Sequence, residues 1–393
     1  MRRITFLLFC AFVTIPLFAQ LNGDGYYRIQ NVTTGRYLSI VNNKVDDTNK
    51  NALMSGNNGV VYSLKTIKPF DEVASDPGSV IFIESNGSNQ YTIIAQGMNT
   101  YQLTGGLTLK IVLREGSYFI YGSKSGFTLY LKDSGDLSEN SGTIGLEGGQ
   151  TGAVKWIITP VSTAKEYFGI NADLALGDKY YTTMFCGFPY ELGEGMKAYY
   201  IDRYTATGAE TDAVEFIEIT SGVVPAKTPV IIESNSDKAS DNKVTPLADS
   251  QGPAAISNNI LKGVYFSFVR RKDNGEELTN KMATQLKNVV SYDPQTMRIL
   301  GIHDGKLCFT QATDLEYLPA NKAYIQVPAT ASANMTMLDQ AEFTAGINNI
   351  FMDNTVKNSG VYSLTGIRLK SDNTIDNLPN GIYIVGGKKL VKK

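Results

Sequence analysis

The strongest constraint in this sequence is a pattern of five positions that recurs three times between residues 21 and 161. The positions lie at offsets 0, +2, +8, +11 and +13, as an apolar pair, a turn residue and a second apolar pair. The copies are Tyr27, Ile29, Gly35, Leu38, Ile40; then Val80, Phe82, Ser88, Tyr91, Ile93; then Tyr118, Ile120, Gly126, Leu129, Leu131. Each copy predicts a strand, a turn and a second strand whose alternate residues face one side.

Further apolar alternations follow each copy, so that three units of about 45 residues fill this part of the chain. One of them contains Trp156, between Val154 and Ile158. Three similar units, each with several short strands, predict a barrel with pseudo-threefold symmetry. Closure of the barrel would also leave no strand edge exposed.

The stretch GYYRIQNVTTGRYLSI (residues 25–40) resembles the opening of a ricin-type β-trefoil lectin repeat, and the resemblance extends over residues 21–161. It implies a β-trefoil fold and carbohydrate binding. The chain departs from that family at three points. Val154 stands where the Gln of the Gln-x-Trp signature is expected, Ser39 replaces an acidic residue, and the cysteines of the repeat are missing.

Residues 162–344 contain eight or more short apolar runs separated by turn residues, which favours a β-sandwich. Pro225-Ala226 and Pro319-Ala320 stand 94 positions apart, and each predicts a turn that leads into a buried strand. The segment resembles a β-module of exported surface proteins of Bacteroidota. The stretches that carry this resemblance are GDKYYTTMFCGFPYELGEGMKAYYI (177–201) and LEYLPANKAYIQVP (315–328).

Residues 345–393 contain VYSLTGIRL (361–369) and LPNGIYIVGGKKLVK (378–392), which predict two hairpin-like strand pairs. These motifs resemble the C-terminal sorting domain of the type IX (Por) secretion family. The resemblance implies that a secretion machinery recognises the C-terminus. The alternative is a small terminal β-unit that packs on the preceding domain.

The N-terminus reads MRRITFLLFCAFVTIPLFAQ, with two arginines, a short apolar run and a small residue before Gln20. This is the pattern of a secretory signal peptide, and we predict cleavage after Ala19. The run is too short to cross a membrane comfortably, and no other stretch is long and apolar enough. We therefore predict four segments: a signal peptide (1–19), a β-trefoil-like domain (20–161), a β-sandwich domain (162–344) and a C-terminal β-unit (345–393). The fold class is all-β, and the mature protein is expected to be secreted or at the cell surface, without a membrane span.

The charge of the chain argues against a nucleic-acid partner. There are 36 Lys and Arg against 38 Asp and Glu; without Arg2 and Arg3 of the leader the balance is 34 − 38 = −4. Nucleic-acid binding proteins instead carry a basic patch or excess. The single histidine, His303, lies next to Asp304 at a predicted hairpin tip, where we expect it to be solvated. We expect no metal, no cofactor and no enzymatic activity.

Cys186 and Cys308 are the cysteines that remain after the leader. Both lie in strand-like, aromatic surroundings, which favours buried thiols that pack as small apolar side chains. Export also permits a disulfide between them, and the spacing does not decide between the two states.

Carbohydrate binding is the sharper functional hypothesis for residues 21–161. A sugar site needs an aromatic ring against the C–H face of the sugar and amide or carboxylate groups for its hydroxyls. If offsets 0, +2, +11 and +13 face the core, then Tyr121, Tyr37 and Tyr130 at offsets +3, +10 and +12 face outward. We expect Tyr37 to act with Asp46, and Tyr130 with Asp136, in ligand binding.

Three alternatives remain open at this point. The repeat domain is a purely structural trefoil whose tyrosines cover neighbouring strands, or the chain is a surface adhesin or scaffold that binds other proteins. A glycosidase is the third alternative, because two carboxylates suffice for that chemistry. The acidic residues that raise it are Glu191, Glu194, Asp202, Glu215 and Glu218.

Overall fold

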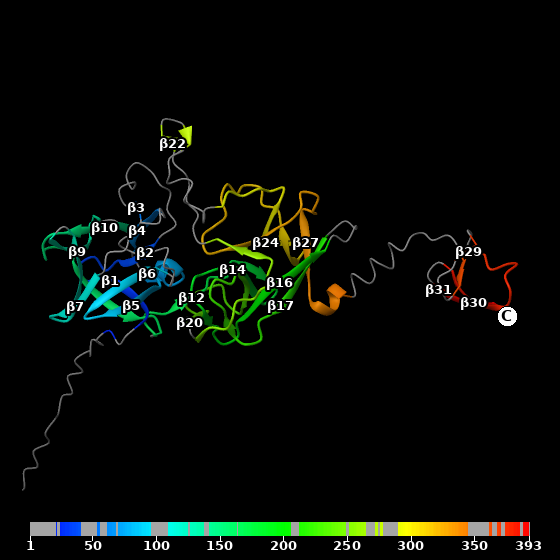
Figure 1. Cartoon of the computed structure of the whole chain (residues 1–393), viewed down its shortest axis with the longest axis horizontal. Coiled ribbons are helices and arrows are strands. Elements are labelled where there is room, and N and C mark those ends of the chain that lie inside the picture. The colour runs from blue at the N-terminus through cyan, green and yellow to red at the C-terminus, as the bar shows by residue number, and fades with distance from the viewer. Residues whose placement is uncertain are drawn as a thin grey trace, which may run out of the picture. The chain divides into compact units, whose positions relative to one another are not determined.

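The computed structural model describes residues 21, 24–40, 53–55, 61–67, 70–95, 109–124, 126–136, 141–162, 164–205, 212–248, 251–264, 272–273, 276–277, 290–344, 361–363, 368–370, 374–385 and 388–392. Within these ranges helix is limited to α1 (Phe70–Val73), the 3-10 turn η2 (Pro77–Ser79), a 3-10 position at Gln251 and one turn at residues 340–344 (Figure 1). The prediction of an all-β chain is confirmed. The predicted signal peptide lies outside the described residues, and no described helix has the length and apolar character needed to cross a membrane.

Contacts within the chain define two compact units, the first ending at Glu166 and the second beginning at Tyr167. The strands of the first unit are β1 (Gly25–Asn31), β2 (Tyr37–Ile40), β3 (Leu53–Ser55), β4 (Val61–Ile67), β5 (Ile81–Gly87), β6 (Gln90–Ala95), β7 (Leu109–Arg114), β8 (Ser117–Lys124), β9 (Phe127–Asp133), β10 (Ser141–Glu147) and β11 (Lys155–Pro160). Successive antiparallel pairings run β1–β5–β6–β7–β8–β11 and return to β1, so these strands form a closed ring. A closed ring satisfies the backbone groups that an open sheet would leave at its edges.

The repeated sequence pattern corresponds to equivalent structure in two of its three copies. At offset +2, Ile29 and Ile120 are completely buried, as predicted. Phe82, at the same offset in the second copy, is only half-buried, because on β5 its neighbours Ile81 and Ile83 face the core instead. The three turn residues, Gly35, Ser88 and Gly126, all have positive φ, of 68°, 52° and 81°. Glycine adopts this conformation without steric cost, whereas a residue with a Cβ loses about 1–2 kcal/mol. The turn is therefore kept even in the copy where serine makes it unfavourable.

The second unit is built around one large sheet. Its strand order is β13 (Leu174–Leu176), β14 (Lys179–Met184), β19 (Val230–Ser234), β16 (Lys197–Thr205), β17 (Asp212–Glu218), β27 (Asn334–Leu338), β25 (Lys306–Thr310), β24 (Met297–His303), β26 (Ala323–Gln326) and β21 (Leu261–Gly263). Smaller pieces are β12 (Phe168–Gly169), β20 (Lys243–Pro246), β15 (Tyr190–Glu191) and β18 (Val223–Val224), in that order in a second sheet, and the pair β22 (Lys272–Asp273) and β23 (Glu276–Glu277). The core is sandwich-like, because Ile201 and Ile231 from one half of the large sheet pack in one cluster with Phe309 and Ile325 from the other half.

The two predicted Pro-Ala turns are confirmed, and each leads into a buried strand, β19 and β26 respectively. The residue after each Pro-Ala pair, Lys227 or Asn321, has positive φ, of 55° and 57°. The two turns therefore share a backbone conformation as well as a sequence pattern.

The two ends of the large sheet meet along a line that we call the seam. Thr183 of β14 accepts a hydrogen bond from the backbone N–H of Ala323 of β26 at 3.0 Å through its Oγ1. Phe185 donates its backbone N–H to the carbonyl of Asn321 at 2.9 Å, and the Asn321 side chain donates back to the carbonyl of Phe185 at 2.9 Å. The ring of Phe185 lies directly over Gly263, where a Cβ would be 2.1 Å from it. Glycine is thus required at this crossing.

The C-terminal segment forms a separate small sheet of order β29 (Arg368–Lys370), β28 (Val361–Ser363), β30 (Gly381–Val385) and β31 (Lys388–Lys392). Val361, Tyr383 and Val385 form its core on one face. On the opposite face Ile382 and Val391 are cross-strand partners, and both are exposed.

Candidate functional site

The prediction that Tyr37 and Tyr130 face outward is wrong, because both side chains are buried. Tyr37 is 3% exposed; its ring packs on Phe70 of α1, with ring centroids 5.6 Å apart, and its hydroxyl donates to Glu166 Oε1 at 3.0 Å. Burial and the Glu166 carboxylate raise the pKa of Tyr37. The outward face of β2 is covered because α1 and the chain after β11 pack on it. Asp46, the expected partner of Tyr37, lies outside the described residues.

Tyr130 is 8% exposed, and its hydroxyl accepts a hydrogen bond from Gln150 Nε2 at 2.6 Å. Asp136, its expected partner, is exposed, and its carbonyl oxygen accepts from Arg36 Nη1 at 2.9 Å. The carboxylate that the fold uses here is that of Asp133, which pairs with Arg36 in the interior. Sequence reasoning missed Arg36, because its partner lies 97 positions later and no local pattern connects the two residues.

One sheet face around Tyr130 does bring together groups that bind polar ligands, and we call it the β8–β10 face. It consists of Tyr121, Tyr130, Lys132, Glu147 and Gln150. Tyr121 and Tyr130 are cross-strand partners with ring centroids 5.3 Å apart and planes at 41°. Glu147 lies opposite Tyr130 on β10, and its Oε2 is 2.9 Å from Lys132 Nζ.

The β8–β10 face packs on buried side chains on one side and is exposed to solvent on the other. Phe119 packs edge-on against Tyr130 at 6.1 Å, and Val154 completes the buried cluster beneath the rings. Tyr121 itself is only half-buried, Gln150 is exposed, and the Lys132 and Glu147 side chains are 29% and 43% exposed. A ring, an amide, a carboxylate and an ammonium thus reach solvent side by side, from β8, β9, β10 and the bend that follows β10. Tyr121 was among the positions predicted to face outward, but no sequence pattern joins it to Gln150.

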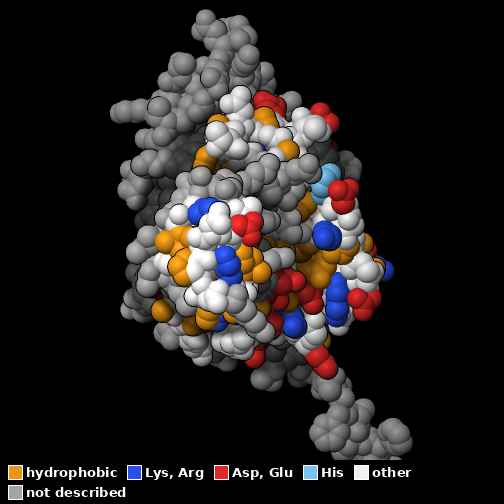
Figure 2. Space-filling view, turned by 90° about the vertical axis from the view of Figure 1, so that its right-hand side faces the viewer, with side chains coloured by type: hydrophobic (Ala, Val, Ile, Leu, Met, Phe, Trp, Pro, Cys, Tyr) orange, Lys and Arg blue, Asp and Glu red, His pale blue; other side chains and the backbone are white. Residues whose placement is uncertain are grey.

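Two of the five acidic residues that raise the glycosidase alternative, Glu215 and Glu218, are paired with basic side chains. Glu215 is buried, and its Oε2 accepts from Arg203 Nε; Glu218 lies 3.2 Å from Lys197 Nζ. His303 is at the tip of the β24–β25 hairpin, 3.4 Å from Asp304, with its side chain 52% exposed (Figure 2). Among the described residues, no group of three or more His, Cys, Asp or Glu side chains is placed to hold a metal ion.

Cys186 and Cys308 are both free and buried. The sequence left open whether they form a disulfide or remain as separate thiols, and the structure shows separate thiols. Burial raises the pKa of Cys186 to about 12 and also raises the pKa of Cys308. Since the thiolate is the reactive form, both thiols should be inert in the folded protein.

We therefore expect no labelling of Cys186 or Cys308 in the native chain by a thiol reagent such as Ellman's reagent at pH 8. After denaturation without reductant, both cysteines should react. Absorbance of the released chromophore measures the number of thiols. Fast labelling of native protein, or no labelling of denatured protein, would contradict the buried free thiols.

Comparison with known proteins gives no similar protein from which the role of the β8–β10 face could be inferred. No family model matches the chain, and neither the curated proteins nor the solved structures contain a match to it.

Proposed function

We propose that this chain is an exported, non-catalytic binding protein whose first unit binds carbohydrate through the β8–β10 face. The observation that carries the proposal is the half-buried ring of Tyr121, which lies beside the Tyr130 hydroxyl and the exposed Gln150 amide. Sugar recognition uses an aromatic surface for the C–H face and a few fixed polar groups for the hydroxyls.

The polar groups of this face retain hydrogen-bonding capacity after their internal contacts. Gln150 donates one amide N–H to Tyr130 and has a second N–H and a carbonyl oxygen for a ligand. The Tyr130 hydroxyl accepts that bond and has its own proton to donate. Glu147 and Lys132 offer an acceptor and a donor within one ion pair. Each sugar hydroxyl both donates and accepts a hydrogen bond, so neighbouring hydroxyls can pair with this mixture of donors and acceptors.

The resemblances at the two ends of the chain support export. The stretch 1–20 has the composition of a signal peptide, and the VYSLTG and LPNGIY motifs contribute to strands β28 and β30. The strand ring of the first unit agrees with the β-trefoil resemblance. We therefore propose a glycan ligand at or outside the cell surface, and recognition of the C-terminal sheet by a secretion machinery.

A glycan array with the mature chain tests the carbohydrate proposal. We expect saturable binding to a defined glycan, reduced at least tenfold in a Tyr121→Ala, Gln150→Ala double variant. Phe127→Ala is the matched control, because Phe127 is 71% exposed on β9 but points to the opposite face from Tyr130. Binding that survives in the double variant, or no binding by the folded wild-type chain, would overturn the proposal.

A protein ligand is the second candidate, and the C-terminal sheet favours it. Ile382 and Val391 form an exposed apolar pair on that sheet, and large exposed apolar side chains that cluster often mark interaction surfaces. A folded chain that is silent on the glycan array would shift the proposal to this alternative.

A further inference from the structure

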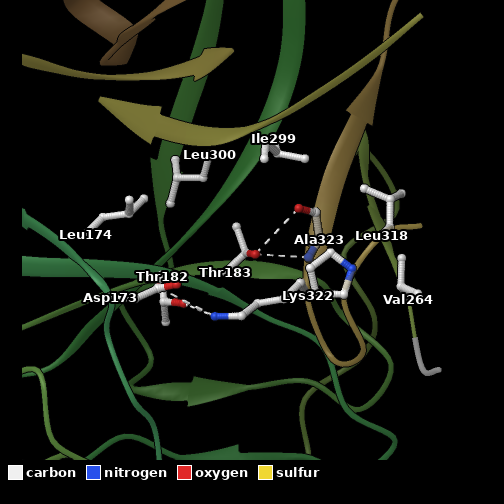
Figure 3. A pocket seen from close by; sticks show the side chains of 11 residues that line it. Asp173, Leu174, Thr182, Thr183, Val264, Ile299, Leu300, Leu318, Lys322 and Ala323 are labelled. Carbon is white, nitrogen blue, oxygen red and sulfur yellow. Dashed lines mark hydrogen bonds and ion pairs between the residues drawn. The ribbon is translucent and has the colours of Figure 1, made fainter. Parts of the chain in front are cut away.

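The seam of the second unit contains a small pocket, with a volume of about 110 Å³ (Figure 3). It opens where β13 and β14 at one end of the large sheet face β24 and β26 near the other end. Its lining is mostly apolar and includes Leu174, Ile299 and Leu300, with Asp173, Thr182 and Lys322 as the polar groups. Leu300 and Leu318 are almost completely buried, so the pocket reaches the hydrophobic core.

The polar groups gather on one side of the pocket. The Lys322 side chain extends across it, and its Nζ donates to Thr182 Oγ1 and lies 3.6 Å from Asp173 Oδ1 (Figure 3). The Lys322 side chain is 34% exposed, whereas that of Asp173 is 68% exposed. Burial lowers the pKa of Lys322, and the Asp173 carboxylate opposes that effect. Thr183 is committed to the backbone of Ala323 and takes no part.

The size and the apolar walls determine which group fits inside. A dry cavity of about 150 Å³ holds a benzene ring, so this slightly smaller pocket suits a branched aliphatic group of four or five carbons. The aliphatic side chains of Leu174, Ile299 and Leu300 surround that volume. Moving a branched aliphatic group from water into these surroundings is favourable, because apolar surface is removed from water.

The positive charge of Lys322, at the edge of the pocket, determines which polar group of a ligand would lie next to the aliphatic group. The Lys322 side chain is about two-thirds covered, so its ammonium gains from an anion that replaces the hydration lost on burial. The exposed Asp173 holds it only weakly, since exposed ion pairs at such distances contribute little. A carboxylate has two acceptor oxygens, one for Lys322 Nζ and one for the hydroxyl proton of Thr182.

We propose that the seam pocket binds a carboxylate attached to a short branched aliphatic group. This chemistry occurs in free branched-chain acids and at the C-terminus of a peptide that ends in Leu, Ile or Val. The site lies in the second unit and is independent of the carbohydrate site proposed for the first.

Titration calorimetry with the mature chain tests the proposal, with 4-methylpentanoate, 4-methylpentan-1-ol and acetate as probes. We expect the acid to bind at least tenfold more tightly than the alcohol, which lacks the charge, and than acetate, which lacks the branched group. Lys322→Met preserves the apolar stem of the side chain. It should reduce the affinity for the acid at least tenfold and leave the affinity for the alcohol unchanged. Lys306→Met, at an exposed lysine of β25, is the matched control and should change neither.

A second variant, Leu174→Phe, fills the pocket from its half-buried rim and should abolish binding of acid and alcohol alike. Peptides ending in Leu, compared with their C-terminal amides, then distinguish a chain end from a free acid as the source. Equal affinities for acid and alcohol, equal acid binding by wild type and Lys322→Met, or no binding of the acid at millimolar concentration would overturn the proposal.

Discussion

Replacing Asp133 with Ala should lower the free energy of unfolding of the first unit by about 3–5 kcal/mol. Asp133 and Arg36 form a bidentate pair, with Nε–Oδ2 and Nη2–Oδ1 distances of 2.8 and 2.9 Å, and both side chains are almost inaccessible to solvent. Thr34 Oγ1 also donates to Asp133 at 2.6 Å. Without the carboxylate, the guanidinium of Arg36 stays in the interior without its anionic partner.

Fluorescence during guanidinium denaturation measures this effect for the first unit alone. Trp156 is the single tryptophan of the chain; it is fully buried, and its indole N–H donates to the carbonyl of Leu131 at 3.0 Å. Glu115→Ala is the matched control, because Glu115 is exposed and lies 3.9 Å from Lys155. That exposed pair should contribute less than about 1 kcal/mol. Equal losses in the two variants would show that burial of the Arg36–Asp133 pair is not what makes it important.

Gly263→Ala should destabilise the second unit by about 1–3 kcal/mol, since extra volume in a packed interior forces its surroundings to move. The added Cβ would meet the ring of Phe185 at 2.1 Å. Neither side can retreat easily: Gly263 is paired with Ala323 in the sheet, and the Phe185 backbone is bonded to Asn321.

Thermal unfolding followed by circular dichroism, combined with a double-mutant cycle, checks this explanation. Phe185→Leu removes the ring, so Gly263→Ala should cost much less in that background than in the wild type. Gly148→Ala, where a Cβ would meet nothing within 4 Å, is the control for the substitution itself. An unchanged cost of Gly263→Ala in the Phe185→Leu background would contradict the steric explanation.

The strands and turns of the first unit could be predicted because they are local. Alternation places Ile29 and Ile120 in the core, and the spacing places Gly35 and Gly126 at turns that require positive φ. The burial of Tyr37 could not be predicted in the same way. Alternation separates the two faces of a strand but does not say whether a second element covers the outer one. The element that covers β2 is α1, which at four residues is too short to give a helical pattern.

The candidate sites depend on contacts that no local pattern encodes. Tyr121 and Gln150 meet because β8, β9 and β10 are neighbours in the sheet, with Glu147 in register with Tyr130. The pocket at Lys322 exists because a large sheet curls until its ends meet. The sequence predicts the turn before β26, but it does not indicate that Thr182, about 140 positions earlier, lies next to it.

The pairing of β1 with β11 has a mechanical consequence for a protein held at both ends. These strands are antiparallel, with Tyr27 opposite Pro160, and Val161 donates its N–H to the carbonyl of Tyr26 at 3.1 Å. The chain therefore enters and leaves the first unit at the same point of the barrel wall. Tension on the chain would pull β1 and β11 apart from this shared end, along the direction of their hydrogen bonds, and would therefore load those bonds one after another rather than all together. The first unit should thus peel open at low force, starting at Tyr26 and Val161.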